Sequence, residues 1–324
     1  MTIPRRRFLQ LAGSAALAAT SQPAGAQAYP SRPITVMVFV GAGGAPDIIA
    51  RLIGQGLSQR LGQPVIVENR PGGGGNLALQ AVARAPADGH TLLLIATPHA
   101  INVTLYEKLN VNVMRDIVPV ASINNDSFVM LVNPSMPVRT VAEFIAHAKS
   151  NSGRINLTSS GNGNLTHLSG ELFRMASGLE MVHVPYRNTP AALTALMAGE
   201  VHVIFDALPS ALPHVKAGSL RALGVTTPAR AKALPDVPSI ADSVPGYSVT
   251  GWLGIGAPQG TPPDIIERLN KEIGAVISDR EIAARLVSFG SEPFTSSPSE
   301  FGKFIAAEAE KWGQVVRFAG LKVE

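Results

Sequence analysis

Glycine-rich and small polar residues stand where the chain could bind an anion. In the segment of residues 41–47, Ala42, Gly43 and Gly44 follow an apolar run and can bring their backbone N–H groups close to a ligand. Asp47 is placed to cap the helix that is expected to follow. Because a helix N-terminus presents unpaired N–H groups and a partial positive charge, this loop suits a carboxylate even without a buried lysine or arginine.

Two other loops have a similar composition at the expected end of a strand. One carries Thr97, directly after the apolar run of residues 92–96. The other covers residues 159–167, where hydroxyl, glycine and amide residues open a helix and can form a nest of N–H groups for an oxyanion. The ligand contacts predicted there are Ser160, Gly161, Asn162 and Thr166. We expect this loop to hold the ligand from the side opposite Thr97 and the glycines.

A fourth element pairs residues 184–189 with residues 205–207, again at strand ends. Tyr186 and Asn188 are placed to set selectivity for the far part of the ligand. Asp206, the only charged residue in an apolar strand, is either a buried acid that accepts a hydrogen bond from the ligand or the cap of the next helix.

Catalytic and cofactor motifs are weak in this sequence. Pro46 occupies the position where a G-x-G-x-x-G dinucleotide loop needs its last glycine, and neither a P-loop nor a G-x-S-x-G elbow occurs. The seven histidines have no metal-ligand spacing, so neither a metal nor a cofactor is expected. His167 and Glu171 share a helix face four residues apart, a spacing typical of a surface contact. The alternative function is an exported α/β hydrolase that uses Ser160 with His167, although no acid is evidently placed to orient that histidine.

Composition narrows the function classes further. The chain has 324 residues, 46% of them hydrophobic and 15% charged, which favours a folded protein with two lobes over a disordered chain. The absence of cysteine excludes disulfides and thiolate chemistry. Without the three arginines at residues 5–7, the chain has 24 basic and 23 acidic residues. A nearly neutral chain without a basic run is not expected to bind nucleic acid.

The first 26 residues have the pattern of an export signal. Arg5 to Arg7 precede a short apolar region, and residues 24–26 form an A-x-A cleavage site. The segment around these arginines is similar to the twin-arginine consensus, while the general secretory route stays open. We expect cleavage near Ala26 and a mature protein in the periplasm.

Apolar runs and periodic helical patterns alternate along the mature chain. Strands are expected at residues 34–40, 65–67, 92–96, 128–132, 155–159, 181–184, 201–207, 220–226 and 249–255. Helices are expected at residues 47–61, 76–84, 140–149, 165–176, 190–198, 209–217, 262–278, 280–289 and 298–318. Repeated strand–helix–strand units predict doubly wound parallel sheets with helices on both faces.

The three helices expected from residue 262 onward need a surface on which to pack, and the first lobe provides one. We therefore expect one lobe from residues 29–125 plus 248–324 and a second lobe from residues 126–247. Two crossings, near Asn124 and Ser248, would form a hinge with a ligand cleft between the lobes.

Short matches over the whole mature chain identify a family resemblance. The sequence resembles the extracytoplasmic solute receptors of tripartite tricarboxylate transporters, often called Bug proteins. The matching segments lie at residues 29–34, 43–51, 61–72, 87–93, 99–106, 167–173, 184–187, 205–214 and 220–223.

This resemblance implies a type II periplasmic binding-protein fold that closes over a ligand. It implies a small organic carboxylate as ligand, held mainly by main-chain N–H groups. It also implies a monomer that serves a membrane permease of the same transporter class or, where no permease exists, a sensor kinase. Asn188 stands where the family usually has glycine, which places an amide in the cleft.

Overall fold

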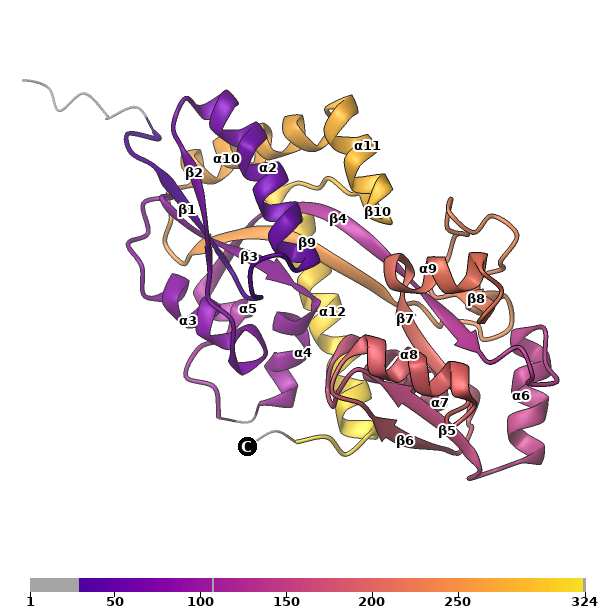
Figure 1. Cartoon of the computed structure of the whole chain (residues 1–324). Helices are drawn as coiled ribbons and strands as arrows, with labels where there is room; N and C mark the ends of the chain where they lie inside the picture. The colour runs from indigo at the N-terminus through magenta and orange to yellow at the C-terminus, as the bar shows by residue number, and fades with distance from the viewer. Residues whose placement is uncertain (1–28, 107, 323–324) are drawn as a thin grey trace, which may run out of the picture.

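A computed structural model describes residues 29–106 and 108–322. The predicted signal peptide, residues 1–26, lies outside the described residues. The strands form one connected ten-stranded sheet with the order β2-β1-β3-β9-β4-β7-β5-β6, while β8 and β10 pair with β4. Figure 1 shows helices on both sides of this sheet and two groups of elements joined by the long strands β4 and β9.

The first group of elements is built on three parallel strands. Strand β1 pairs with both β2 and β3, and the helices that follow them begin at the carboxyl ends of these strands. The bounds are β1 Ile34–Val38, α2 Ala45–Leu61, β2 Val65–Asn69, η1 Gly73–Gly75, α3 Asn76–Ala83, β3 Thr91–Ala96, α4 Thr97–Leu105 and α5 Val113–Asp116.

The second group repeats this arrangement. Strand β5 runs parallel to β6 and β7, which buries one apolar face of the sheet against α7 and the other against α8 and α9. The bounds are α6 Val141–Ser150, β5 Ile155–Ser159, α7 Leu165–Ser177, β6 Met181–Pro185, α8 Thr189–Ala198, β7 Val203–Ala207, α9 Leu208–Lys216, β8 Arg221–Val225 and η2 Ile240–Asp242.

Strands β4 (Ile117–Val132) and β9 (Thr250–Pro258) connect the two groups. β4 pairs with β9 from Ile117 to Ser127, and from Phe128 onward it pairs with β7 and β8. The predicted parallel pairing holds for β1 with β2 and β3 and for β5 with β6 and β7, whereas the β3–β9, β9–β4 and β4–β7 ladders are antiparallel. The chain leaves the first group along β4 and returns along β9, so two crossing strands that pair with each other must run in opposite directions.

The C-terminal segment packs beneath the crossing strands. It consists of α10 Pro263–Ile277, α11 Arg280–Ser288, β10 Ser291–Pro293 and α12 Pro298–Phe318. Helix α12 contacts α4 of the first group and α7 of the second. The buried Glu308 on this helix accepts hydrogen bonds from the indoles of Trp252 in β9 (3.2 Å) and Trp312 (2.9 Å). One hydrophobic core therefore continues under both groups.

Below, lobe 1 denotes residues 29–125 with 248–324, and lobe 2 denotes residues 126–247; these boundaries remain our proposal. In the part of the chain that the structure describes, no helix is long and apolar enough to cross a membrane.

Candidate functional site

A cavity of about 400 Å³ lies between the two lobes. Its volume falls in the range of roughly 300–1,000 Å³ that is usual for small-molecule sites. The first turn of α2 forms one wall and the first turn of α9 forms another, while β4, β9 and the end of α11 close the rest. Its lining includes Ala45, Pro46, Asp126, Ser210, Leu253 and Phe289.

Asp47 holds the loop between β1 and α2 in place. Its side chain is 2% exposed and accepts hydrogen bonds from the N–H of Gly43 (2.9 Å) and from Asn69 Nδ2 (2.8 Å). Arg51 pairs with the same carboxylate at 2.9 Å. Gly43 has φ +84°, a left-handed conformation that glycine adopts without strain. The N–H of Gly43 therefore serves the loop itself in this structure.

The charge state of Asp47 follows from these partners. Burial favours the neutral acid, but the hydrogen bonds from Arg51, Gly43 and Asn69 outweigh it and lower the pKa of Asp47 to about 2. The loop is thus anchored by a fixed negative charge at neutral pH.

The start of α9 is anchored by a second buried aspartate. Asp206 is 1% exposed and lies on β7, and Ser210 in the first turn of α9 donates a hydrogen bond to its carboxylate. The carbonyl of Ala207 lies 2.9 Å from Ser210 Oγ and is a second acceptor for the same hydroxyl hydrogen. Burial raises the pKa of Asp206 to about 6, although the hydrogen bonds that its carboxylate accepts from Ser210 and from the backbone of Ala207 oppose the shift. Asp206 does not line the cavity; its partner Ser210 does.

The two helices that begin at the cavity share one property. Neither Gly44 before α2 nor Ala207 before α9 caps its helix with a side chain, and both helices have proline in the first turn. Helical geometry leaves the N–H groups of Ala45 in α2 and Leu208 in α9 without intrahelical acceptors. These N–H groups and the partial positive charge of the two helix ends suit an anionic group.

The loop at residues 159–167 has a different construction. Asn164 caps α7 by accepting from the N–H of His167 (3.1 Å) and also from Thr166 Oγ1 (2.7 Å). The hydroxyl of Thr166 accepts from the N–H of Ser160 (3.0 Å). Gly163 lies against Leu105 of α4, where an added Cβ would stand 2.8 Å from that side chain. The loop faces lobe 1, but its polar groups largely satisfy one another, and Asn162 remains exposed.

The other predicted contacts have partners within the fold. Thr97 is buried, and its hydroxyl accepts from the N–H of Trp252 (3.1 Å), which ties α4 to β9. Asn188 caps α8 by accepting from the N–H of Ala191 (3.0 Å). The hydroxyl of Tyr186 donates to Glu200 (3.4 Å).

The pair needed by the hydrolase alternative is not formed. His167 Nδ1 accepts from the N–H of Gly163 (3.1 Å), and Nε2 faces Glu171 at 3.5 Å, so neither nitrogen reaches Ser160. Glu171 is 1% exposed, so the expectation of a surface contact between His167 and Glu171 is wrong. The pair is buried because α7 packs this face on the sheet, where His167 stacks on His183 with ring centroids 3.5 Å apart.

Asp126 is a polar group in the cavity that the sequence did not single out. It follows the predicted crossing at Asn124, and the nearness of a charged residue to that hinge was the available signal. Its Oδ1 accepts from Asn124 Nδ2 (2.8 Å) and from Ser291 Oγ. Burial raises the pKa of Asp126 to about 6 against these two hydrogen bonds.

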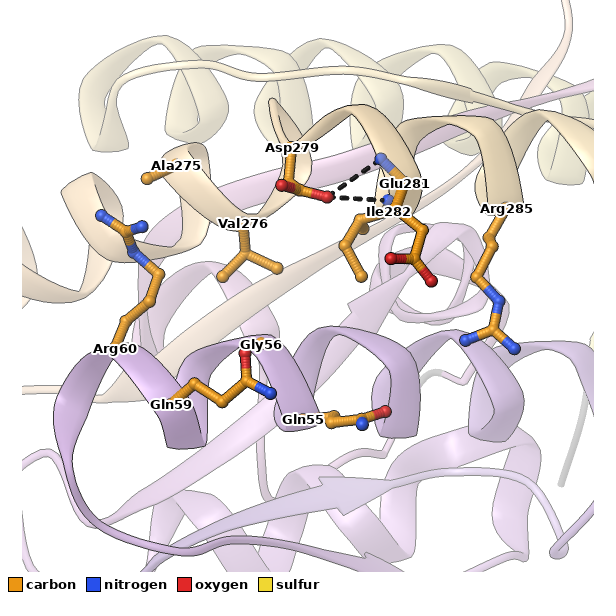
Figure 2. Close-up of a pocket in the computed structure, with 10 residues that line it drawn as sticks. All are labelled: Gln55, Gly56, Gln59, Arg60, Ala275, Val276, Asp279, Glu281, Ile282 and Arg285. Atoms are coloured by element: carbon orange, nitrogen blue, oxygen red, sulfur yellow. Dashed lines mark hydrogen bonds between the residues drawn. The ribbon is translucent and has the colours of Figure 1, made fainter.

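A separate hollow lies on lobe 1 alone. It runs between α2 and the helices α10 and α11, where Gly56 faces Val276 and Asp279 caps α11 (Figure 2). An added Cβ on Gly56 would stand 2.7 Å from Val276, so this glycine lets the helices approach closely. Because lobe 2 contributes nothing to this hollow, closure of the lobes could not act on a ligand there. Among the described residues, no group of three or more potential metal ligands occurs.

Two α/β lobes on crossing strands, with a cavity of small-molecule size between them, define a two-lobed solute-binding protein. The chain belongs to the receptors of the tripartite tricarboxylate transporter family, whose family model matches residues 49–321. The protein is therefore a solute-binding receptor and not an enzyme.

Relatives support this assignment over nearly the whole chain. Protein BugT of Bordetella pertussis is 33% identical over 320 residues, which cover 98% of this chain and 96% of BugT. Among solved structures, R. palustris Rpa4515 with adipate is 35% identical, with a TM-score of 0.77, and the match covers 91% of this chain and 100% of that one. MatC (Rpa3494) from Rhodopseudomonas palustris with bound malate is 31% identical, with a TM-score of 0.73, covering 89% and 100%.

Proposed function

We propose that this receptor captures a small organic carboxylate between its lobes and delivers it to a membrane permease of the tripartite tricarboxylate type. The observation that carries the proposal is the cavity between two helix starts without side-chain caps. The two relatives solved with adipate and with malate support it, because both of those ligands are carboxylates. A sensor kinase is the second candidate partner.

The proposed carboxylate site begins at the loop of lobe 1. The N–H groups of Ala42 and Ala45 hold one end of the ligand. The N–H of Gly44 joins them by giving up its hydrogen bond to the carbonyl of Gly41 (3.3 Å), while Gly43, Asp47 and Thr97 keep the loop and the neighbouring helix in place. From lobe 2, the ligand meets the first turn of α9, which Asp206 anchors, and the loop described next.

The loop at residues 159–167 is proposed to complete the site. Ser160, Gly161, Asn162 and Thr166 approach the ligand from lobe 2, with Tyr186 and Asn188 beyond them. Since Ser160 and Thr166 already bond to each other, their hydroxyls must turn to meet a ligand. We therefore assign this loop a smaller part of the binding free energy than the helix starts.

Closure links capture to delivery in this proposal. A ligand that contacts both lobes only when they are closed shifts a hinged equilibrium toward the closed form. The permease then binds the closed form and receives the ligand from it. In this proposal the predicted export signal at residues 1–26 is cleaved, and the mature protein acts as a monomer in the periplasm, where a membrane permease is accessible to it.

A thermal-shift screen tests this function directly. The mature protein is heated with a panel of organic acids, each compared with its amide, which keeps the shape of the acid but not its charge. Binding to the native state raises the melting temperature by mass action, so acids at millimolar concentration should give a shift of a few degrees and amides none. Equal shifts for acids and amides would contradict a carboxylate site. The screen is repeated after denaturation and refolding, which removes any ligand carried through purification.

A further inference from the structure

The polar side chains of the cavity between the lobes can accept hydrogen bonds from a ligand, but their own donors are already used within the protein. Its three serines each donate their hydroxyl hydrogen to the protein: Ser210 to Asp206, Ser288 to the carbonyl of Arg285, and Ser291 to Asp126. In the described part of the chain, no lysine, arginine or histidine lines the cavity. Its side chains therefore offer a ligand hydrogen-bond acceptors, and the donors come from the helix starts.

Asp126 is the strongest of these acceptors. Both hydrogen bonds to its carboxylate fall on Oδ1, and no described residue donates to Oδ2. Asp126 lines the cavity together with Leu253 and Phe289, and the remaining walls of the cavity are mostly apolar. Asp126 is half-buried, so a ligand that fills the cavity would cover its free oxygen, and a donor on that ligand would avoid the cost of leaving the oxygen unpaired.

The start of α2 and Asp126 therefore favour ligand groups of opposite character. The start of α2 favours an anion, while Asp126 favours a hydrogen-bond donor and repels a second anion. Pro46 and Ile48 add apolar contact at the start of α2, and Leu253 lies on β9, which stands between β1 and β4 in the sheet. A ligand that fits this cavity has a carboxylate at one end, an apolar middle and a donor at the other end.

We propose that Asp126 determines specificity by accepting a hydrogen bond from a hydroxyl or ammonium group at the far end of the ligand. This inference rests on the proposed function, since it assumes that a carboxylate binds at the helix starts. It names the ligand class as amino or hydroxy acids with an apolar body, and it disfavours dicarboxylates of the same length.

A matched series of acids tests the inference by isothermal titration calorimetry. The series is hexanoate, adipate, and the two hexanoates that carry a terminal hydroxyl or a terminal ammonium group; it is repeated with chains of four and eight carbons. At the best chain length, the wild-type protein should bind the donor-ended acids at least ~10-fold more tightly than the plain acid, and the dicarboxylate should not exceed the plain acid.

Two variants assign the preference to Asp126. Asp126→Asn should lose the preference for the ammonium-ended acid, because the amide carries no charge. Asp236→Asn removes an exposed aspartate of lobe 2 and should leave the order unchanged. Because the order of the wild-type affinities is itself decisive, the test stands even if Asp126→Asn folds poorly.

The outcomes separate the inference from the proposed function. If the acids bind but the plain acid or the dicarboxylate matches the donor-ended ones, the inference is overturned and the carboxylate receptor stands. If Asp126→Asn keeps the wild-type order, the role of Asp126 is overturned. An amine and an alcohol of the same chain length without a carboxylate complete the series. If they bind as tightly as the donor-ended acids, the proposed function fails, although Asp126 is still the acceptor. If no acid binds, both the proposed function and the inference about Asp126 are contradicted.

Discussion

The two helix starts that face the cavity are built alike but differ in charge. Each is anchored by a buried aspartate, Asp47 for α2 and Asp206 for α9. Asp47 has Arg51, Asn69 and the N–H of Gly43 as partners, and its pKa is about 2. Asp206 has mainly Ser210, and burial raises its pKa to about 6. The donors around each carboxylate and the desolvation of that carboxylate therefore decide together whether an anchor is ionised.

This difference predicts that lobe 1 presents a rigid end of the site and that lobe 2 presents one that responds to pH. The variants that follow are ordered by expected effect.

Removing the anchor of lobe 1 should have the largest effect. Asp47→Ala leaves Asn69, Arg51 and the N–H of Gly43 without their shared partner, and we expect a loss of ~3 kcal/mol in the free energy of unfolding. The pKa of Asp47 lies below its value of 3.8 in the unfolded chain, so its contribution is present above pH ~4 and lost as pH falls toward 2. The loss, measured by urea denaturation, should therefore be constant from about pH 5 to 8.

The matched control is Asp264→Ala, which removes an exposed aspartate from the first turn of α10. This variant should lose less than ~1 kcal/mol. Equal losses in the two variants would mean that Asp47 is not an anchor.

A negative charge at the start of α2 should prevent binding without unfolding the protein. Ala45→Asp places a carboxylate in the cavity wall, and we expect ~100-fold weaker binding of an organic acid by calorimetry, or about 2.7 kcal/mol. Stability should not fall, because an acidic residue in a first turn is favourable. Ser299→Asp adds the same charge to the first turn of α12 and should bind as wild type. Unchanged affinity in Ala45→Asp would remove α2 from the site.

The protonation of Asp206, the anchor of lobe 2, should be visible in the pH dependence of stability. Because the pKa of Asp206 is raised to about 6 in the folded protein, the folded state binds the proton more readily than the unfolded chain, and stability falls as pH rises from about 4 to 6. Asp206→Asn removes this dependence. The stability of the variant relative to wild type should rise by about 2 kcal/mol between pH 4 and pH 7. A difference that is flat with pH would show that Asp206 is ionised as fully as Asp47.

The capped loop of lobe 2 should contribute least. Asn164→Ala removes the side-chain cap of α7 and should cost about 1 kcal/mol of stability, with affinity for the acid changed only a few-fold. Asn188→Ala removes the equivalent cap of α8 and serves as the comparison. A loss of affinity in Asn164→Ala as large as in Ala45→Asp would reverse our ranking of the two lobes.

Much of the fold could be predicted from periodicity. The bounds of α12 and β5 match the expected ranges, and the predicted α2 begins only two residues late. Helix α4 was missed because Pro98 in its first turn suggested a loop, whereas proline is tolerated there. The first half of β4 was missed because Ser122, Asn124 and Asn125 interrupt its apolar pattern. Asn124 and Asn125 pair there with Pro293 and Glu292 of β10, a contact that no local pattern reports.

The site was harder to predict for a similar reason. The sequence analysis pointed to strand ends and to the glycine-rich loop at residues 41–47, but it also assigned ligand contacts to the polar residues 159–167 and to Asn188. In the structure, Asn164 and Asn188 use their polarity to cap their own helices, while the plain Gly44 and Ala207 leave theirs uncapped. Asp126 meets α2 and α9 only through the three-dimensional arrangement of the lobes, so its nearness to the predicted crossing at Asn124 was the one signal that the sequence offered.

Backbone amide shifts in the mature protein test the central claim most directly. The nuclear magnetic resonance spectrum of the ¹⁵N-labelled protein is recorded while an acid identified in the screen is added, with its amide as a control. We predict that the largest acid-specific shifts fall on the N–H groups of Ala45 and Leu208, with smaller shifts at the loop of residues 159–167. Shifts confined to amides outside the cavity, or equal for acid and amide, would contradict a carboxylate held by these two helix starts.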